Sequence, residues 1–247
     1  MTQPFLDTAR LLATARKAHR PIVSGSIVTV PTDFDQAYAL QNAMITHDGG
    51  AGGWKVLAGG ADVPQTSPLP RDRFYADGAR IACPLAYLAE AEVAVELSAD
   101  LPARDTPWPP AEIAARIRNV RPAIELCSSA LSDRDQAVPM LRLGDTQNNA
   151  AVITGAAVAV EGLPDLSALV IGLQVDDRQD SVATGASWDQ ILTTLAWLAG
   201  HAAARGLPLT AGDIVITGAR IKLPMTGDAR RVSADLGPLG TVSVNLG

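Results

Sequence analysis

The chain has 247 residues and an acidic balance, with 26 Asp and Glu against 20 Lys and Arg and a formal net charge of −6. This charge, and basic residues that are scattered rather than clustered, argue against a nucleic-acid-binding surface. No apolar run approaches the ~20 residues of a membrane-spanning helix, and the first residues lack the basic and apolar regions of a secretory signal. We therefore expect a cytoplasmic protein with small-molecule partners, and neither a nucleic acid nor a membrane as partner.

The length permits one large domain with a complete core, and we expect a single domain over residues 1–247. Its first part, residues 1–50, is rich in helix-type patterns. The rest, residues 51–247, is rich in strand-type patterns.

Two helices are predicted in the first part of the chain. Apolar residues at helical spacing over residues 5–15 predict the first helix, which ends before Pro21. The second helix runs through residues 37–45, with Thr32 as the expected N-cap, and it stops at residues 49–50, which are both glycine. These helices would precede the strand-rich core.

Alternating or short apolar runs predict strands over most of the remaining chain. The predicted strands lie at residues 54–57, 80–83, 89–97, 120–126, 157–160, 169–175, 214–217, 232–236 and 241–246. Residues 64–73 are predicted as a loop, and further helices are expected over residues 111–119 and 189–204. The last two strands are expected to form a hairpin through residues 237–240. Strands in runs, rather than in strict β-α-β alternation, favour an α+β fold with a strand-rich core.

Three carboxylates lie in apolar surroundings. Glu90 and Glu92 fall on one face of the strand predicted over residues 89–97, because successive strand side chains point to opposite faces. Carboxylates this close repel each other, and a bound Mg²⁺ or Mn²⁺ would supply the balancing charge through oxygen ligands. Glu125, inside another apolar strand, is a candidate third ligand. A solvated strand face is the alternative for the Glu90–Glu92 pair, since charged residues are mostly exposed.

Motifs for several other chemistries are absent from the sequence. There is no Gly-x-Ser-x-Gly elbow, no dinucleotide fingerprint, and no short His and Cys spacing for zinc. His19, His47 and His201 lie near predicted helix ends, where they are expected to be capping cations. Cys83 and Cys127 have no Cys-x-x-Cys partner and are expected to be small buried thiols.

Several motifs, taken in chain order, resemble the 2-keto-4-pentenoate hydratase branch of the fumarylacetoacetate hydrolase superfamily. The matching segments are residues 35–41, 53–56, 67–72, 76–81, 90–95, 121–125, 195–199, 209–218 and 239–244. The resemblance covers nearly the whole chain. It implies an α+β fold of the fumarylacetoacetate-hydrolase type, a mixed β-sandwich roll with an N-terminal helical segment. It also implies one catalytic domain whose core binds Mg²⁺ or Mn²⁺ through Glu90, Glu92 and Glu125.

The resemblance implies roles for further residues. Lys55 would hold the substrate carboxylate or move a proton, with a pKa lowered by burial, whereas a surface lysine is the alternative. Asp72 would orient or activate water, or it is a turn aspartate that bonds its own backbone. The expected substrate-binding residues are Gln147, Asn149, Thr217 and Gly218. A polar turn and a strand exit would explain these four residues as well.

Three segments depart from the hydratase pattern. The family's Gly-His-Pro before the C-terminal helix is Asp189-Gln-Ile191, its Asp-Met pair is Asp72-Arg73, and its Asp-Asn pair is Asn148-Asn149. These changes leave the metal carboxylates intact. They do not decide which reaction of the superfamily the chain catalyses.

The expected function is metal-dependent addition of water to a 2-hydroxy-2,4-dienoate in aromatic catabolism. Superfamily members act on 2-keto or 2-hydroxydienoic acids, which chelate the cation through the carboxylate and the C2 oxygen, and the cation stabilises an enolate. A 4-oxalocrotonate-type decarboxylase would use the same enolate. An acylpyruvate C–C hydrolase is another alternative, which the lack of a motif-borne histidine disfavours.

A non-catalytic subunit that stabilises a sister enzyme is the alternative of a different class. The intact carboxylates disfavour it, and the lost Gly-His-Pro pattern favours it. The resemblance implies a homo-oligomer as the assembly, and a complex with a sister pathway enzyme is a further expectation.

Overall fold

The computed structural model describes residues 5–60 and 65–247. The helices are α1 (Leu6–Lys17), α2 (Phe34–His47), α3 (Pro110–Ala114), α4 (Pro139–Gly144) and α5 (Trp188–Ala204). The short 3₁₀ helices are η1 (Ser24–Ser26), η2 (Arg71–Arg73), η3 (Thr146–Asn148), η4 (Leu166–Ala168) and η5 (Gly237–Leu239).

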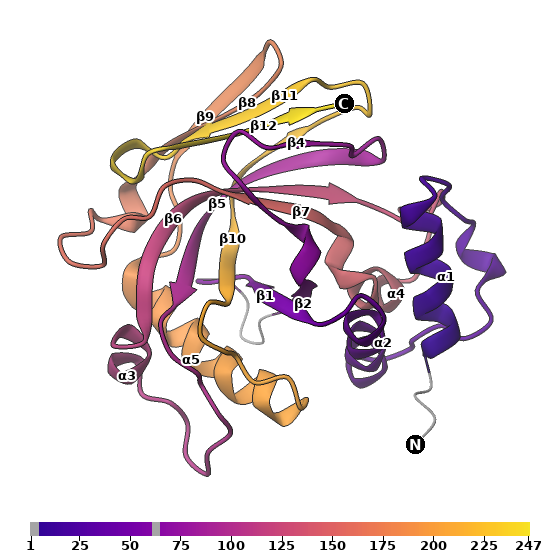
Figure 1. The fold of residues 1–247 in the computed structure, drawn as a ribbon, viewed down its shortest axis with the longest axis horizontal. Coiled ribbons are helices and arrows are strands. Elements are labelled where there is room, and N and C mark those ends of the chain that lie inside the picture. Colours follow the sequence, from indigo (N-terminus) through magenta and orange to yellow (C-terminus); the bar gives the residue numbers. More distant parts are fainter. Residues whose placement is uncertain (1–4, 61–64) are drawn as a thin grey trace.

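The strands of these residues form two sheets (Figure 1). A seven-stranded sheet has the order β2 (Thr66–Pro70), β1 (Ala51–Val56), β10 (Ile214–Pro224), β5 (Ala86–Leu97), β6 (Ile117–Ser128), β7 (Asn149–Thr154) and β3 (Phe74–Ala76). A five-stranded sheet has the order β4 (Arg80–Ile81), β12 (Thr241–Leu246), β11 (Arg231–Asp235), β8 (Val170–Val175) and β9 (Arg178–Ala183). Two sheets with helices packed against them confirm the predicted α+β fold.

The main hydrophobic core joins the two sheets and continues to α5. Ala91, Val93 and Val95 of β5 belong to this core and are fully buried. Burying one valine side chain contributes about 1.5–3 kcal/mol. Because strand side chains alternate, Glu90 and Glu92 lie on the other face of β5, which is also buried. The acidic residues therefore face away from the main core, toward a second buried region of the molecule.

The N-terminal helices form a separate hydrophobic cluster at one end of the seven-stranded sheet (Figure 1). Leu12 of α1, Leu40 and Met44 of α2, and Leu141 of α4 are buried in it. The two helices predicted in this part of the chain are confirmed. Their packing fixes α4, which lines the pocket described below.

Helix boundaries differ from the prediction at two places. Asp33, not Thr32, caps α2, because its carboxylate accepts a hydrogen bond from the Gln36 backbone N–H at 2.8 Å. The helix predicted over residues 111–119 ends early, as α3, and β6 begins at Ile117. Pairing of β6 with β5 outweighs the local helical pattern there.

Strand boundaries also differ. Part of the loop predicted over residues 64–73 is strand β2, while residue 64 lies outside the described residues. Pro68 and Pro70 fit this strand because β2 is at an edge of the sheet, where a missing N–H is tolerated. Residues 157–160 form only a bridge between Val158 and Val120. Strands β7 and β9 were not predicted. The expected C-terminal hairpin is present as β11 and β12.

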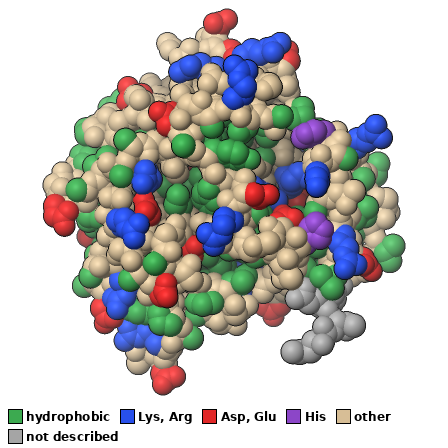
Figure 2. Space-filling view, viewed as in Figure 1, with side chains coloured by type: hydrophobic (Ala, Val, Ile, Leu, Met, Phe, Trp, Pro, Cys, Tyr) green, Lys and Arg blue, Asp and Glu red, His purple; other side chains and the backbone are tan. Residues whose placement is uncertain are grey.

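Acidic and basic side chains are interspersed on the face shown in Figure 2, with apolar side chains between them. This face therefore carries no continuous basic stripe. Within residues 5–60 and 65–247, no helix is long and apolar enough to cross a membrane.

Candidate metal centre

Three carboxylates meet on the buried face of β5 and β6. Glu90 lies directly opposite Glu125 in the pairing of the two strands, and Glu92 is two residues further along β5. Their exposed fractions are 6% for Glu90, 1% for Glu92 and 0% for Glu125. As predicted, Glu90 and Glu92 face the same pocket. The alternative of a solvated strand face is wrong, because pairing on both sides of β5 and packing over its face remove it from water.

Burial and neighbouring carboxylates raise the pKa of Glu92 and of Glu125. Burial, together with the charges of Glu125 and Glu90, holds the pKa of Glu92 well above its usual range. Burial also raises the pKa of Glu125, although the Lys55 ammonium acts in the opposite direction. Positive charge beside Glu92 and Glu125 therefore favours their ionised forms.

Lys55 supplies part of that charge. Its Nζ atom donates hydrogen bonds of 2.7 Å to both carboxylate oxygens of Glu125. Burial alone would lower the pKa of Lys55, but its anionic neighbours, Glu125 foremost, together outweigh burial and raise it above its ordinary value. The lowering expected from burial near a cation stays a prediction, because the charged groups that act most strongly on Lys55 in this arrangement are anions. The surface-lysine alternative is also wrong, since the Lys55 side chain is only 15% exposed.

Lys222 of β10 is a second cation at the site, and sequence reasoning missed it. It lies directly opposite Glu90 in the pairing of β10 with β5, and its Nζ atom is 2.8 Å from Glu90 Oε1. No local pattern identifies this residue, since the two positions are brought together only by the order of the strands. The cluster thus holds three carboxylates and two ammonium groups.

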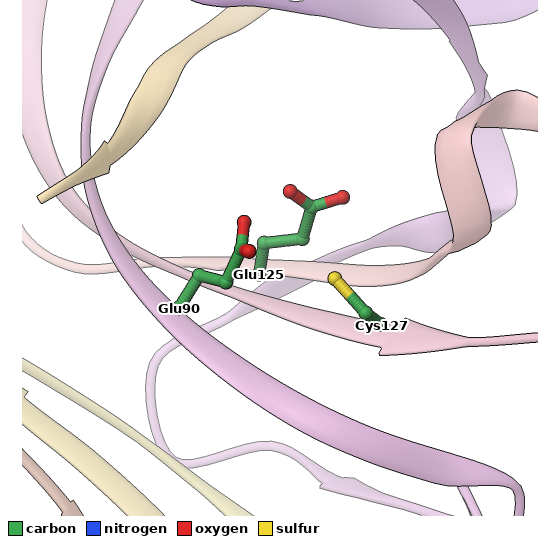
Figure 3. Close-up of side chains that lie close together, drawn as sticks. All are labelled: Glu90, Glu125 and Cys127. Carbon is green, nitrogen blue, oxygen red and sulfur yellow. The ribbon is translucent and has the colours of Figure 1, made fainter. Parts of the chain in front are cut away.

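Cys127 lies beside the carboxylates, as Figure 3 shows. Its Sγ atom and one oxygen each of Glu90 and Glu125 lie within 4.8 Å of one another. The prediction of a buried thiol is confirmed for Cys127, whereas Cys83 is only partly buried. Burial and the Glu125 charge hold the pKa of Cys127 well above its ordinary value, so the protonated thiol is the stable form in this arrangement.

Gly218 approaches the cluster from β10. Its backbone N–H donates a 2.6 Å hydrogen bond to Glu92 Oε2. A side chain at this position would be unfavourable, because φ is +108° and a Cβ atom would lie 2.7 Å from Cδ1 of Leu57. Thr217, by contrast, is buried and donates its hydroxyl to the carbonyl of Val93 at 2.8 Å. The structure therefore brings Gly218 to the pocket, while the Thr217 hydroxyl is used within the sheet.

A left-handed turn lies across the pocket from β5. Thr146, Gln147 and Asn148 have φ values of 50°, 51° and 60°. Each such residue costs about 1–2 kcal/mol, so a run of three needs support from its surroundings. Gln147 and Asn148 line the pocket, and Asn149 donates its side-chain Nδ2 to Glu125 Oε1 at 2.8 Å. The side-chain oxygens of all three amides are buried without a hydrogen-bond partner in the part of the chain that the structure describes.

Two arginines support this turn. Arg73 donates to the Thr146 hydroxyl at 2.9 Å and to the Asn149 carbonyl at 2.7 Å. Arg16 of α1 forms a 2.7 Å ion pair with Asp145. Arg73, which replaces the family's methionine, thus holds the left-handed turn through these two hydrogen bonds.

Two other sites named from the sequence lie elsewhere. Asp72 is exposed in η2 and is not among the pocket residues, because η2 directs Arg73 inward and Asp72 toward solvent. The structure therefore does not bring Asp72 to the carboxylates. Asp189 is in the first turn of α5, where Ser187 and Gln190 form a capping box. The segment that replaces the family's Gly-His-Pro therefore lies in the first turn of a helix with a complete capping box.

The pocket in front of the carboxylates has a volume of about 650 Å³. Apolar side chains form part of its wall, among them Val56, Leu88 and Met140, and Arg142 and Lys222 add positive charge. Mostly apolar pockets with a few placed polar groups are typical of small-molecule sites. A hollow of about 680 Å³ on the five-stranded sheet lacks a comparable set of buried carboxylates.

The donor set fits a divalent cation. Buried carboxylate oxygens are the ligands that Mg²⁺, Mn²⁺ and Ca²⁺ prefer. Glu90, Glu92 and Glu125 provide them, and the unpartnered amide oxygens of the nearby turn add acceptors for a ligand. The raised pKa values of Glu92 and Glu125 indicate a deficit of positive charge that such a cation would remove.

This chain is similar to several known proteins. Residues 61–244 match the family described as fumarylacetoacetate (FAA) hydrolase C-terminal. A 2-keto-4-pentenoate hydratase of Burkholderia vietnamiensis is 30% identical over 188 residues, 74% of this chain and 70% of the relative. The 2-keto-4-pentenoate hydratase 3 of Pseudomonas putida is 29% identical over 168 residues, 65% of this chain and 60% of the relative, so the match leaves out part of that protein.

A solved structure shares the whole fold. The 4-oxalocrotonate decarboxylase from Pseudomonas putida G7, complexed with magnesium and adipate, has a TM-score of 0.82 at 22% sequence identity. The match covers 100% of this chain and 98% of that chain. The β-sandwich roll expected from the resemblance is therefore confirmed. The family match and the hydratase relatives together show that this chain belongs to the fumarylacetoacetate hydrolase family.

Proposed function

We propose that this chain is a divalent-metal-dependent hydratase that adds water to a 2-hydroxy-2,4-dienoate. The observation that carries the proposal is the buried cluster of Glu90, Glu92 and Glu125, with Lys55 bonded to Glu125. Glu90, Glu92 and Lys55 line a pocket. The relatives named 2-keto-4-pentenoate hydratase support the same reaction.

Glu90, Glu92 and Glu125 would hold the metal. When bound, the cation supplies Lewis-acid stabilisation of negative charge at the C2 oxygen of the acid, an effect on the order of several kcal/mol. The Gly218 N–H orients Glu92 for this task, and Lys55 orients Glu125.

The remaining residues would bind substrate and place the proton and the water. Lys55 holds a proton at Nζ beside the carboxylates, which makes it the proposed donor to the dienol. Protonation at C5, with loss of the proton from the C2 hydroxyl, gives an α,β-unsaturated ketone. The oxygen of water then adds at C4 and a proton adds at C3. The free side-chain oxygens of Gln147 and Asn148 are placed to accept hydrogen bonds from that water or from the acid.

A 4-oxalocrotonate-type decarboxylase is the second candidate. Arg142 lines the pocket, as does Lys222, which pairs with Glu90. Two cations facing one pocket favour an acid with a second carboxylate. The acylpyruvate hydrolase candidate is weaker, since no histidine lines the pocket among the described residues. The complete carboxylate set also disfavours a non-catalytic subunit.

Further parts of the proposal concern the cofactor and the assembly. We propose Mg²⁺ or Mn²⁺ as the metal, and residues 1–247 as one catalytic domain in which residues 51–247 bind it. We also propose a role in aromatic catabolism, a cytoplasmic location, and a homo-oligomer or a complex with a sister pathway enzyme. The oxygen-donor set supports the choice of metal.

The test follows the ultraviolet absorbance of 2-hydroxypenta-2,4-dienoate with Mg²⁺ or Mn²⁺ and, separately, with EDTA. Wild-type protein should consume the dienoate only with metal, and Glu92→Gln should reduce turnover by at least about 100-fold. Glu96→Gln is the matched control, since Glu96 lies on the same strand but pairs with Arg121 outside the pocket. Release of CO₂ from 4-oxalocrotonate without dienoate hydration would favour the decarboxylase. Turnover of the dienoate in EDTA would contradict the metal-dependent mechanism.

A further inference from the structure

The two lysines of the carboxylate cluster are held very differently. The Lys55 side chain is 15% exposed and donates to both oxygens of Glu125. The Lys222 side chain is 58% exposed and contacts one oxygen of Glu90. Exposed ion pairs contribute little to stability, whereas buried bidentate contacts resist separation. Lys222 is therefore the cation that can leave the cluster at low cost.

A divalent cation on Glu90 would compete with Lys222 directly. The Lys222 Nζ atom is 2.8 Å from Glu90 Oε1, within the space that a cation bound to that oxygen needs. Two positive groups at such separations repel each other, and solvent at the exposed Lys222 side chain screens only part of this repulsion. The partly exposed lysine would move, since Glu90 itself is fixed in the centre of the sheet.

The displaced lysine would still face the pocket, where it can bind a ligand. Lys222 lines the same pocket as Arg142 of α4, and this pocket lies in front of the carboxylates. An ammonium and a guanidinium facing one pocket form a binding site for a carboxylate. An organic acid in the pocket would thus meet Lys222 once the metal has released it.

We infer that Lys222 and a divalent cation compete for Glu90, and that Lys222, once displaced, binds a carboxylate of an acid in the pocket. The inference rests on the proposed metal centre and adds to it a residue that couples the two ligands. Because binding couplings are reciprocal, the acid must also tighten metal binding. Lys222 thereby makes the protein select metal and acid together, with dicarboxylic 2-oxo acids favoured.

The test measures Mn²⁺ affinity from the electron paramagnetic resonance signal of free Mn²⁺, with and without 2-oxoadipate. Lys222→Met should bind Mn²⁺ alone about five- to tenfold more tightly than wild type, because a weak competing ion pair is gone. The tightening by 2-oxoadipate should shrink by a similar factor. Lys222→Arg should behave like wild type, and Lys17→Met, at an exposed position on α1, is the matched control.

Each result decides a different point. Equal or weaker Mn²⁺ affinity in Lys222→Met, with normal binding to wild type, would overturn the inference about Lys222 and leave the metal centre standing. Absence of Mn²⁺ binding in both proteins would overturn the metal centre and the inference together. An unchanged effect of 2-oxoadipate in Lys222→Met would overturn the carboxylate-binding role.

Discussion

Replacement of Arg73 by methionine tests how the pocket is held together. Arg73 is buried and ties the left-handed turn through the Thr146 hydroxyl and the Asn149 carbonyl. Methionine has a similar length and removes only the charge and the donors. The turn that carries Gln147 and Asn148 into the pocket would then lose its main support.

The size of the effect follows from these contacts. Hydrogen bonds from a charged group contribute about 1.5–3 kcal/mol each. The two bonds to the turn are lost, together with the 3.3 Å contact from Arg73 to Asp48. Part of this loss is recovered, since a buried guanidinium is costly to keep from water. Burial, followed by the charge of Arg16, lowers the Arg73 pKa to about 10. We expect the free energy of unfolding to fall by about 3 kcal/mol.

Urea unfolding measures the stability, and Mn²⁺ affinity and dienoate turnover measure the site at a temperature where the variant is folded. Both site measurements should fall, because Asn149 bonds Glu125 and moves with the turn. Arg71→Met is the control, since Arg71 is exposed and donates to a single carbonyl, that of Ala51. A loss of less than about 1 kcal/mol in Arg73→Met, or a stability loss with unchanged metal affinity, would refute the reasoning.

Other substitutions test single features of the structure. Gly218→Ala should lower the free energy of unfolding by about 1–3 kcal/mol in urea titrations and weaken Mn²⁺ binding. The reason is that alanine is strained at this φ and its Cβ would meet Leu57. Unchanged stability and affinity would argue against the close contact between residue 218 and Leu57. Burial and the charge of Arg205 lower the pKa of His201 to about 4, so the folded state disfavours its protonation. Stability should therefore fall as pH drops from about 6.5 toward 4, with a slope of up to about 1.4 kcal/mol per pH unit, and His201→Phe should remove this part of the slope. Asp72→Asn should change turnover by less than about threefold, as expected for an exposed surface change. A much larger loss of turnover would support the predicted role of Asp72 in orienting or activating water.

Local patterns predicted the parts of the fold and site that depend on neighbours in the chain. Alternation in β5 was enough to place Glu90 and Glu92 on one face, because strand periodicity is set by the backbone. Helix α5 carries its own start signal in Ser187 and Gln190. Such features need no knowledge of distant residues.

The missed features have two causes. The strand β9 is exposed and polar, so it has no apolar pattern, and only its pairing with the preceding strand β8 defines it. The other missed contacts join distant parts of the chain. Lys222 and Glu90 are joined by the register of β10 on β5, and Arg73 reaches Thr146 across the fold. No spacing rule within the sequence encodes these two contacts, since their residues are far apart in the chain.

The most direct test of the central claim is anomalous X-ray diffraction from crystals grown with Mn²⁺ and a 2-oxo acid. The proposed centre predicts one strong manganese peak between the carboxylates of Glu90, Glu92 and Glu125, with the acid bound to the same ion. A manganese peak away from these three residues, or an acid bound in the pocket with Lys222 still on Glu90 and no metal, would contradict it.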